Sequence, residues 1–529
     1  MKKKMMTKIV LGAMAVAFSS CTAKYIDINT NQNEPGSLNP DGYALLSAMN
    51  NVASSVVSSD VNTAQFTDCL LGGPLGGYFA ESKTGWANTI SKYDAKNDWT
   101  RVFLNSDQVI PVLYSNLTSI KAYSESSRNP VPWAMAQIIK VAAMSRITDT
   151  YGPIPYSKIG EDGNIVTPYD SQQDIYMKFF EELDASIQTL KENPNVQLVA
   201  NVDKIYDGNL AKWVKFANSL KLRLAIRMAY ADKGKAGEIA MAAVQDGVME
   251  SNADNAAWNN FTSITNPLFT AVRYNESATG GDTHVAADIV CYMNGYKDPR
   301  REAYFEKSTW NRGEDYVGLR RGIDQADPVI SPNYAKYSKV KISATDPIQW
   351  MNAAEVAFLR AEGTEIFGFN LGDSRTYYEK GIQLSFEQWG VQGWESYKED
   401  GRSTPSEYTD PSGKATYNQR LSDITIKWND ADTPEKKQER IITQKWIANW
   451  MLGNEAWADY RRTGYPKLMP AFVNNSGGTV DNVKGARRMP YPQEEYTNNG
   501  ENVQYAVKSL LKDADDMGSD VWWACKPGI

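Results

Sequence analysis

Histidine is almost missing from this chain of 529 residues, since His284 is the single one. Catalysis that depends on imidazole would therefore rest on His284 alone. This residue follows a Gly-Gly pair in the stretch "GGDTHVAAD" and lacks an adjacent group of cysteines or carboxylates. A lone histidine in that setting is a weak candidate for a general base or a metal ligand. We predict no catalytic residue and no metal ligand here.

Nucleotide and calcium motifs are also missing. The stretch "GGPLGGYF" has the glycines of a phosphate loop but not its lysine. "DGN" at residues 162–164 and "NTNQNE" at residues 29–34 supply oxygen atoms. Neither has the twelve-residue spacing of a calcium loop, so bound calcium is not indicated. The sequence therefore predicts no cofactor and no metal.

Long apolar runs are missing as well, and the apolar run near the start is short. Four lysines in the first eight residues precede the uncharged stretch "IVLGAMAVAF" at residues 9–18. A helix of that length rises only about 15 Å, whereas a membrane core is about 30 Å thick. With the small residues Ser19 and Ser20 after it, this segment is typical of a secretory signal peptide. No later run of eighteen apolar residues predicts a membrane span.

Cys21 comes directly after the two serines. This arrangement resembles a bacterial lipobox, whose cysteine is diacylated and becomes the first residue. It predicts a signal peptide at residues 1–20 and a lipidated tether at residues 21–40. Two or more acyl chains give a stable membrane anchor. Phe18 departs from the usual leucine, and the alternative is an ordinary signal peptide followed by a chance cysteine.

Charge and thiols limit the function further. Removal of the leader takes away four lysines and moves the formal net charge from −7 to −11. An acidic chain has no electrostatic reason to bind nucleic acid. Cys69, Cys291 and Cys525 remain, so at most one disulfide can form, and their spacing is not that of metal ligands. We interpret them as structural thiols.

Several long segments have helical periodicity. In residues 174–193 apolar side chains recur at steps of three and four, and residues 209–230 repeat the pattern. Further helices are predicted in residues 132–152, 351–368, 374–390 and 439–457. Paired helices with short loops and alanines at contact positions are typical of tetratricopeptide-like stacks, although no clean 34-residue repeat is present.

Long polar segments at residues 72–98, 254–284, 306–346 and 393–433 interrupt these helices. Segments of that length are usually functional or partly disordered. No change of composition marks a linker. We therefore predict a single domain over residues 41–529 with a mostly α fold, in which tetratricopeptide-like helix pairs carry long decorating loops.

Seven blocks of the sequence stand out: "CTAKYIDINTNQNEP", "MSRITDTYGPIPYSKI", "WVKFANSLKLRLAIR", "DPRREAYF", "ITQKWIANWMLGNEAWADYRRTGYP", "RRMPYPQEEYTNN" and the terminal "VWW". Together they resemble one family, the SusD/RagB-like nutrient-binding outer-membrane lipoproteins of Bacteroidetes-type bacteria, in its branch with the "RRTGYP" block. Their order and spacing span most of the chain. The end departs from the family, because Ala524 and Cys525 follow the Trp pair where an acidic residue is common.

The resemblance implies a helical scaffold of four tetratricopeptide-like helix pairs packed against a loop-rich half. It implies a lipoprotein at the cell surface of the outer membrane that captures a nutrient, usually an oligosaccharide. It also implies a partner, a SusC-like TonB-dependent transporter, which the protein would cover as a lid.

The "RRTGYP" block contains two carboxylates that could act in glycoside hydrolysis. Glu455 and Asp459 are four residues apart and share one helix face. Arg461 and Arg462 lie beside them, and charge-paired carboxylates of lowered pKa are poor general acids. We favour an ion-pair network at a helix end.

The candidate ligand-binding residues are aromatic side chains in the polar segments. The chain has 15 Trp and 29 Tyr, and such rings beside amides suit the apolar faces and hydroxyls of sugars. Tyr78, Trp86 and Trp258 are the predicted contacts, although any single Trp can instead belong to helix packing. A peptide binder and a helical glycoside hydrolase are the alternatives to an oligosaccharide binder.

Overall fold

The computed structural model describes residues 40–84, 89–103, 109–160, 166–259, 265–274, 276, 281–310, 313, 315–511 and 514–529. The predicted signal peptide, Cys21, most of the predicted tether and Trp86 lie outside the described residues. Residues 46–529 form one compact unit, and the described residues 40–45 belong to a separate one. The predicted boundaries at residues 20 and 40 stay predictions.

Helices dominate the described residues, and the mostly α fold class is confirmed. They are α3 (Pro40–Ala53), α4 (Val61–Ala64), α5 (Gly73–Leu75), α6 (Val109–Ser127), α7 (Val131–Tyr151), α8 (Gln172–Glu192), α9 (Leu210–Met228), α10 (Lys233–Asp246), α11 (Pro267–Arg273), α13 (Ala287–Gly295), α14 (Arg301–Tyr304), α15 (Ala353–Phe367), α16 (Ser374–Gln388), α17 (Trp394–Tyr397), α18 (Pro434–Ala448), α19 (Gly453–Thr463), α20 (Gln493–Asn498) and α21 (Gly500–Tyr505).

Strands among the described residues are short and pair in twos, all antiparallel. They are β1 (Phe79–Glu81) with β5 (Thr283–Val285), β2 (Ile154–Pro155) with β3 (Tyr169–Asp170), and β4 (Ala256–Trp258) with β6 (Ile348–Met351). Strands β1 and β4, helix α11 and part of β5 lie inside segments that the sequence predicts as loops. Runs of two to four residues are too short to show a period of two.

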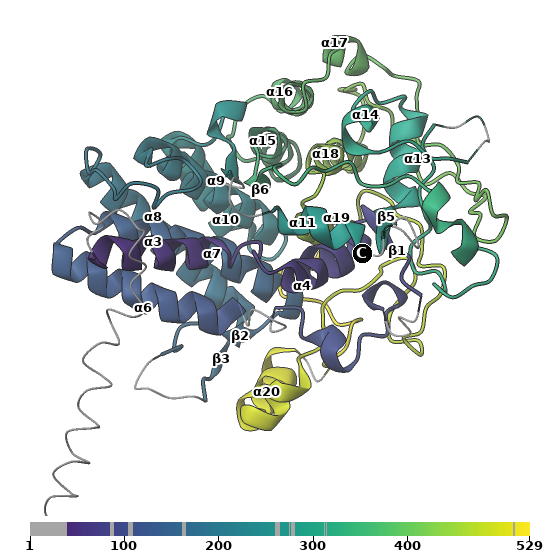
Figure 1. The fold of residues 1–529 in the computed structure, drawn as a ribbon. Coiled ribbons are helices and arrows are strands. Elements are labelled where there is room, and N and C mark those ends of the chain that lie inside the picture. The colour runs from purple at the N-terminus through teal and green to yellow at the C-terminus, as the bar shows by residue number, and fades with distance from the viewer. Residues whose placement is uncertain are drawn as a thin grey trace, which may run out of the picture. The chain divides into compact units, whose positions relative to one another are not determined.

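Consecutive long helices pack on one another (Figure 1). Helix α6 contacts α7, α7 contacts α8, α8 contacts α9, and α9 contacts both α10 and α15. Helix α15 then packs against α16 and α18. The α15–α16 contact is close because the ring of Phe358 lies where a Cβ on Gly381 would stand, 2.7 Å away. This series of helix pairs is the predicted scaffold.

The predicted periodicity of α8 and α9 is confirmed. The α8 stripe is buried through Tyr176, Phe179, Phe180, Leu183, Ile187 and Leu190, and the α9 stripe through Leu210, Trp213, Ala217, Leu220, Leu224 and Met228. The side chain of Ser171 caps α8 by accepting a hydrogen bond from the backbone N–H of Asp174. In the same way, the side chain of Asn209 caps α9 by accepting a hydrogen bond from the backbone N–H of Lys212. Side-chain caps of this kind satisfy N–H groups that the first turn leaves unpaired.

One predicted helix is wrong, because residues 439–457 do not form a single helix. The chain leaves α18 after Ala448 and begins α19 at Gly453, with Met451 at a φ of 76° between them. A Cβ at Gly453 would stand 2.4 Å from the carbonyl carbon of Gly72. The break therefore lets the backbone of α19 rest on the end of the π-helical segment Gln65–Gly72, a contact that local periodicity does not encode.

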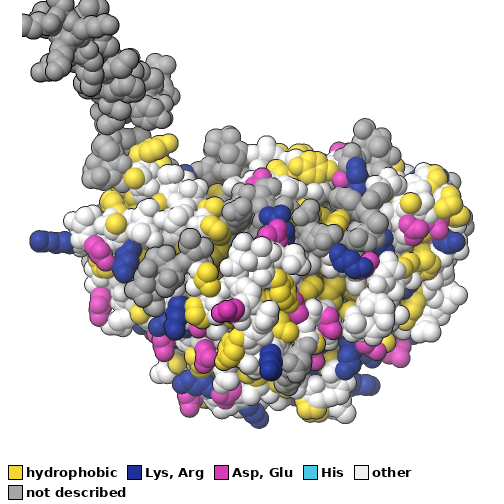
Figure 2. All heavy atoms as spheres, turned by 90° about the horizontal axis from the view of Figure 1, so that it is seen from below, with side chains coloured by type: hydrophobic (Ala, Val, Ile, Leu, Met, Phe, Trp, Pro, Cys, Tyr) yellow, Lys and Arg dark blue, Asp and Glu magenta, His cyan; other side chains and the backbone are white. Residues whose placement is uncertain are grey.

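The described surface mixes charges of both signs. On the face shown in Figure 2, Lys and Arg side chains are interspersed with Asp and Glu, with apolar side chains between them. Such a face does not provide the basic stripe that nucleic-acid binders use. In the described part of the chain, no helix is both long and apolar enough to cross a membrane.

We expect Gly453→Ala to lower the free energy of unfolding by about 1–3 kcal/mol, because the added methyl group meets backbone rather than a movable side chain. Urea denaturation followed by circular dichroism measures this loss. Gly500→Ala is the matched control, since nothing lies within 4 Å of its added Cβ. Equal effects of the two substitutions would contradict the close contact.

Candidate ligand-binding cleft

A cleft of about 920 Å³ opens within the unit formed by residues 46–529. Much of its lining comes from residues 201–212, 252–259, 341–350, 387–389 and 450–457. These segments are the α8–α9 loop with the start of α9, strand β4, strand β6 with its preceding loop, the end of α16, and the α18–α19 connection. The volume lies within the usual range for small-molecule sites, about 300–1,000 Å³.

Asp203 shapes the α8–α9 side of the cleft. Its carboxylate accepts hydrogen bonds from the backbone N–H groups of Ile205, Tyr206 and Gly208, and from the indole of Trp213 at 2.7 Å. These bonds tie the loop to helix α9. The buried Asp203 is therefore a structural group, although it lies in the cleft lining.

Strands β4 and β6 form another wall. Ala257 pairs with Gln349 across the two strands, and both line the cleft. Successive side chains of a strand point to opposite faces. Trp258 follows Ala257, is 4% exposed and does not belong to the lining.

Four tryptophans line the cleft, and none was predicted as a ligand contact. Trp457 donates its indole N–H to the Ala486 carbonyl at 2.9 Å, and the other three form no such bond among the described residues. Of these three, Trp389 and Trp450 both pack on the ring of Tyr304, with centroid distances of 4.7 and 5.4 Å. Trp350 is the third. Oδ1 of Asn454 likewise has no hydrogen-bond partner among the described residues. A buried polar group left unpaired costs about 1–3 kcal/mol.

A chain of side-chain amides runs along the same lining. Asn255 donates to Gln388 Oε1, and Gln388 donates to Gln349 Oε1, both over 3.5 Å. Gln349 in turn donates to the carbonyls of Ala256 and Met351 at 3.1 and 2.6 Å. The two contacts of Gln388 are at the long limit for hydrogen bonds, so its amide is the loosely held member of the chain.

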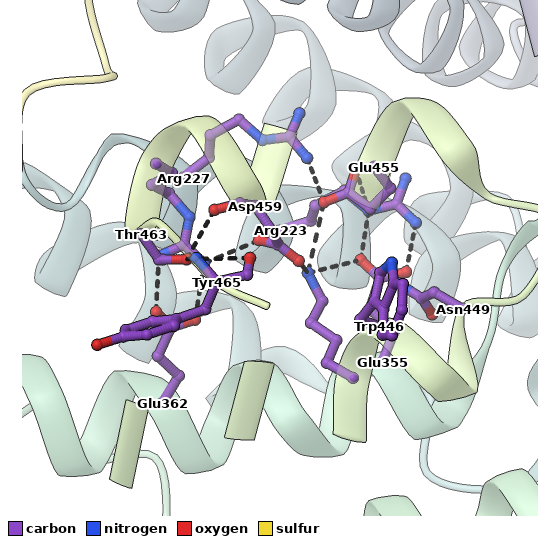
Figure 3. Close-up of polar contacts among 12 residues, drawn as sticks. Arg223, Arg227, Glu355, Glu362, Trp446, Asn449, Glu455, Asp459, Thr463 and Tyr465 are labelled. Carbon is purple, nitrogen blue, oxygen red and sulfur yellow. Dashed lines mark hydrogen bonds and ion pairs between the residues drawn. The ribbon is translucent and has the colours of Figure 1, made fainter. Parts of the chain in front are cut away.

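Buried ion pairs form the floor (Figure 3). Glu455 pairs with Arg227 and lies 3.5 Å from Arg223 Nε and 3.4 Å from Lys445 Nζ. Lys445 Nζ is also 2.7 Å from Asp459. Helices α9, α18 and α19 are joined by these contacts, and the predicted ion-pair network at this helix end is confirmed.

The same contacts decide the protonation of Glu455. Burial by itself would raise the pKa of its carboxyl group, but the charges of Arg227, Arg223 and Lys445 hold that pKa well below its usual range. A general acid needs a pKa near the working pH. Glu455 is therefore an ion-pair partner and not a proton donor at neutral pH.

The predicted ligand contacts are not brought together in the cleft. Tyr78 is fully buried, stacks on Trp446 at 5.6 Å, and donates its hydroxyl hydrogen to the Trp446 carbonyl at 2.5 Å. Its ring offers no face to a ligand in this conformation, so it packs the core. Trp258 is buried next to the cleft, and Trp86 lies outside the described residues. Ligand contact by Trp258 or Trp86 stays a prediction.

His284 and the thiols lie away from the cleft lining. His284 is fully buried in β5, and its Nδ1 is 3.0 Å from Ser82 Oγ. Burial, reinforced by the charge of Lys339, lowers the pKa of His284 to about 3, so its imidazole is neutral at physiological pH. Cys69 and Cys291 are buried, whereas Cys525 is exposed. In the described ranges, no cluster of three or more His, Cys, Asp or Glu side chains is arranged to hold a metal.

Two of the cleft tryptophans escape sequence reasoning because they stand at the edges of regular elements. Trp389 follows the last residue of α16, and Trp450 lies in the break after α18. Both positions continue an apolar helical pattern, which is the signature of packing. The one available signal is the glycine shortly after each of them, Gly390 and Gly453, since glycine marks the end of a helix or a close contact.

We expect Glu455→Gln to cost about 3–5 kcal/mol of unfolding free energy, because it leaves Arg227 and Lys445 buried without a full set of carboxylates. Chemical denaturation at pH 7 measures the loss. Glu250→Gln is the control: Glu250 pairs with Arg360 at 3.0 Å, but its side chain is 68% exposed. We expect less than about 1 kcal/mol there.

The difference in unfolding free energy between the wild type and Glu455→Gln also depends on pH. The pKa of Glu455 is lower in the folded protein than in the unfolded chain, where it is about 4.3. Its stabilisation is therefore complete near neutral pH and decreases as the pH falls below about 4.3. The unfolding free energies of the wild type and Glu455→Gln should therefore come closer together in acid. A difference that stays constant with pH would contradict the ion pairing of Glu455.

The sequence of residues 27–524 matches the profile of a family described as "SusD-like: Susd and RagB outer membrane lipoprotein". A crystal structure of a SusD homolog from Bacteroides uniformis is 65% identical, with a TM-score of 0.89 over 92% of this chain and 100% of that chain. A homolog from Bacteroides thetaiotaomicron is 39% identical, with a TM-score of 0.83 over 92% and 99%.

A structure described as a chitin-binding SusD homolog from Flavobacterium johnsoniae is 33% identical, with a TM-score of 0.82 over 91% of this chain and 99% of that one. No protein with a curated description matches the chain. The resemblance of the seven sequence blocks is confirmed by a profile that extends over nearly the whole chain and by the matching helical fold. The chain belongs to the SusD-like family of outer-membrane lipoproteins.

Proposed function

We propose that this protein is a cell-surface lipoprotein that captures an oligosaccharide in the cleft and delivers it to a SusC-like TonB-dependent transporter of the outer membrane. The observation that carries the proposal is the cleft itself. The cleft has a volume of about 920 Å³, and its lining includes three tryptophans whose indole N–H groups lack partners among the described residues. Aromatic faces beside polar hydrogen-bonding groups suit sugar rings and their substituents.

The relatives support a carbohydrate. The homolog from Flavobacterium johnsoniae is described as chitin-binding, and its fold matches nearly the whole of this chain. A peptide or another nutrient is the alternative ligand, because amides and aromatic rings recognise peptides as well.

The floor of the cleft favours binding without turnover. Hydrolysis of a glycosidic bond needs one carboxyl group with a raised pKa and a second one nearby. The carboxylates of Glu455 and Asp459 are instead held by Lys445, and Asp149 pairs with Arg227. Paired carboxylates are held in position and are not free to approach a substrate.

The proposed membrane anchor and the proposed delivery to a transporter rest on the family and on the leader sequence. The cysteine after Ser19 and Ser20 is the proposed lipid attachment site, with the outer membrane as its destination. A SusC-like transporter is the proposed partner.

Ala253→Arg should abolish binding, because Ala253 is exposed and lines the cleft, so that the long side chain occupies the space without removing a packed residue. A glycan array on residues 22–529 finds a ligand, and calorimetry compares the variants. Ala122→Arg on the exposed side of α6 is the matched control. We expect at least a tenfold weaker affinity for Ala253→Arg alone. Unchanged affinity of Ala253→Arg would exclude the cleft as the binding site. Release of new reducing ends on long incubation would show that the protein hydrolyses its ligand instead of only binding it.

Cys21→Ala should release the protein from the membrane fraction and remove metabolic labelling with palmitate, because the thiol is the proposed acylation site. Fractionation and labelling of cells that express the two forms measure both effects. A variant that is still labelled and membrane-bound would refute lipidation at Cys21.

A further inference from the structure

Arg146 stands in the wall of the cleft as an open position on a helix that is otherwise closed. From Ile138 to Tyr151 every residue of α7 is buried except Arg146, whose side chain is 17% exposed. Arg146 also belongs to the cleft lining. Because its neighbours on the helix are buried, the exposed part of this side chain opens to the cleft.

The guanidinium of Arg146 is only partly used. Within the described part of the chain it donates one hydrogen bond, from Nη2 to Oδ1 of Asp68 at 2.7 Å. Nε and Nη1 have no acceptor there, yet they are not among the buried nitrogens that lack a partner, as guanidinium nitrogens of Arg320 and Arg488 are. Three N–H groups of Arg146, one on Nε and two on Nη1, are therefore accessible to a ligand in the cleft.

Asp68 fixes this guanidinium in place. It lies in the π-helical segment Gln65–Gly72, and such segments occur frequently at functional sites. Its Oδ2 accepts the hydroxyl hydrogen of Thr67 at 2.7 Å, and its Oδ1 accepts a second, longer hydrogen bond from Nδ2 of Asn454 at 3.4 Å. The side chain of Asp68 is only 7% exposed. A binding group held in this way loses little conformational freedom when a ligand arrives.

The pair of Arg146 and Asp68 carries no net charge, and this decides which acceptor it favours. A carboxylate of a ligand would come to lie beside Asp68 when it reached Arg146, and the repulsion between two negative charges opposes its binding. A hydroxyl oxygen is neutral and accepts an N–H without that repulsion. Elsewhere the lining carries charged side chains of both signs. At Arg146 the favoured acceptor is a neutral hydroxyl oxygen.

We infer that Arg146 is a ligand-binding residue of the cleft, that its Nε and Nη1 donate to hydroxyl oxygens of a neutral sugar, and that Asp68 is its positioning residue. The inference rests on the proposed function and deepens it, because it selects neutral over acidic sugars. The hydroxyl hydrogens of the sugar are left for water or for acceptors elsewhere in the lining.

Three pairs of trisaccharides that differ only at C6 test the selection. Cellotriose, α-1,4-galactotriose and β-1,4-mannotriose are neutral, and the triglucuronic, trigalacturonic and trimannuronic acids of the same linkage are their acidic counterparts. Calorimetry with residues 22–529 should show binding of at least one neutral member, at least fivefold tighter than that of its acid. Tighter binding of an acid than of its neutral counterpart would overturn the inference, and so would failure of all three neutral members to bind.

Arg146→Lys keeps the positive charge beside Asp68 but loses the planar set of N–H groups. It should weaken binding of the neutral trisaccharide at least tenfold, with a thermal midpoint close to that of the wild type. Arg128→Lys, at an exposed position outside the cleft lining, is the matched control and should leave the affinity unchanged. Unchanged affinity in Arg146→Lys would overturn the role of Arg146.

Asp68→Asn keeps an acceptor oxygen for Arg146 but removes the negative charge that balances it. The affinity for the acid relative to its neutral counterpart should therefore rise at least fivefold, whereas a merely structural role of Asp68 would weaken both alike. Asp184→Asn is the control, since Asp184 is 63% exposed and lies outside the lining. An unchanged ratio in Asp68→Asn that circular dichroism shows to be folded would overturn the positioning role. Arg146→Lys decides the inference if Asp68→Asn does not fold.

The two proposals fail separately. A glycan that binds the wild type and Arg146→Lys equally, but not Ala253→Arg, would leave the proposed function intact and refute the role of Arg146. Absence of any glycan binding on the array would refute the proposed function itself.

Discussion

The architecture depends on the pairing of buried charges where helices α9, α15, α18 and α19 meet. Lys445 is 1% exposed and lies within 4 Å of Glu355, Glu455 and Asp459. Removal of an ion from water costs several kcal/mol, and only a complete set of partners with good geometry offsets that cost. The four helices must therefore hold one relative arrangement, because any displacement would leave a charge unpaired.

The same network explains why this floor suits binding better than catalysis. Arg462 holds Glu362 through two hydrogen bonds of 2.7 and 2.9 Å, and Asp459 through a third of 2.9 Å. Carboxylates fixed in this way do not move toward a substrate. Under the proposed function, recognition is left to the other side chains of the lining, which include the indoles, the amides and charged residues such as Lys204 and Asp207.

Much of the helical scaffold was predictable because its signals are local. The stripes of α8 and α9 repeat within single segments, and the residues that they bury were identified correctly. The break between α18 and α19 was not, since its cause is the backbone near Gly72, almost four hundred residues earlier. The cleft was predicted less well. The sequence predicts aromatic residues in polar segments as ligand contacts, yet Tyr78 packs against Trp446, because a large ring gains more from burial than from exposure.

The sequence by itself determined the family, the helical class and the short-range ion pair of Asp459 with Arg462, because each depends on residues close together in the chain or on motifs in order. Only the tertiary structure decided that Arg227 of α9 meets Glu455 of α19, and that Trp350, Trp389 and Trp450 line one cleft. The physical reason is that a buried charge or an indole N–H imposes a demand for a partner without specifying which distant residue supplies it. Packing of the helices makes that choice.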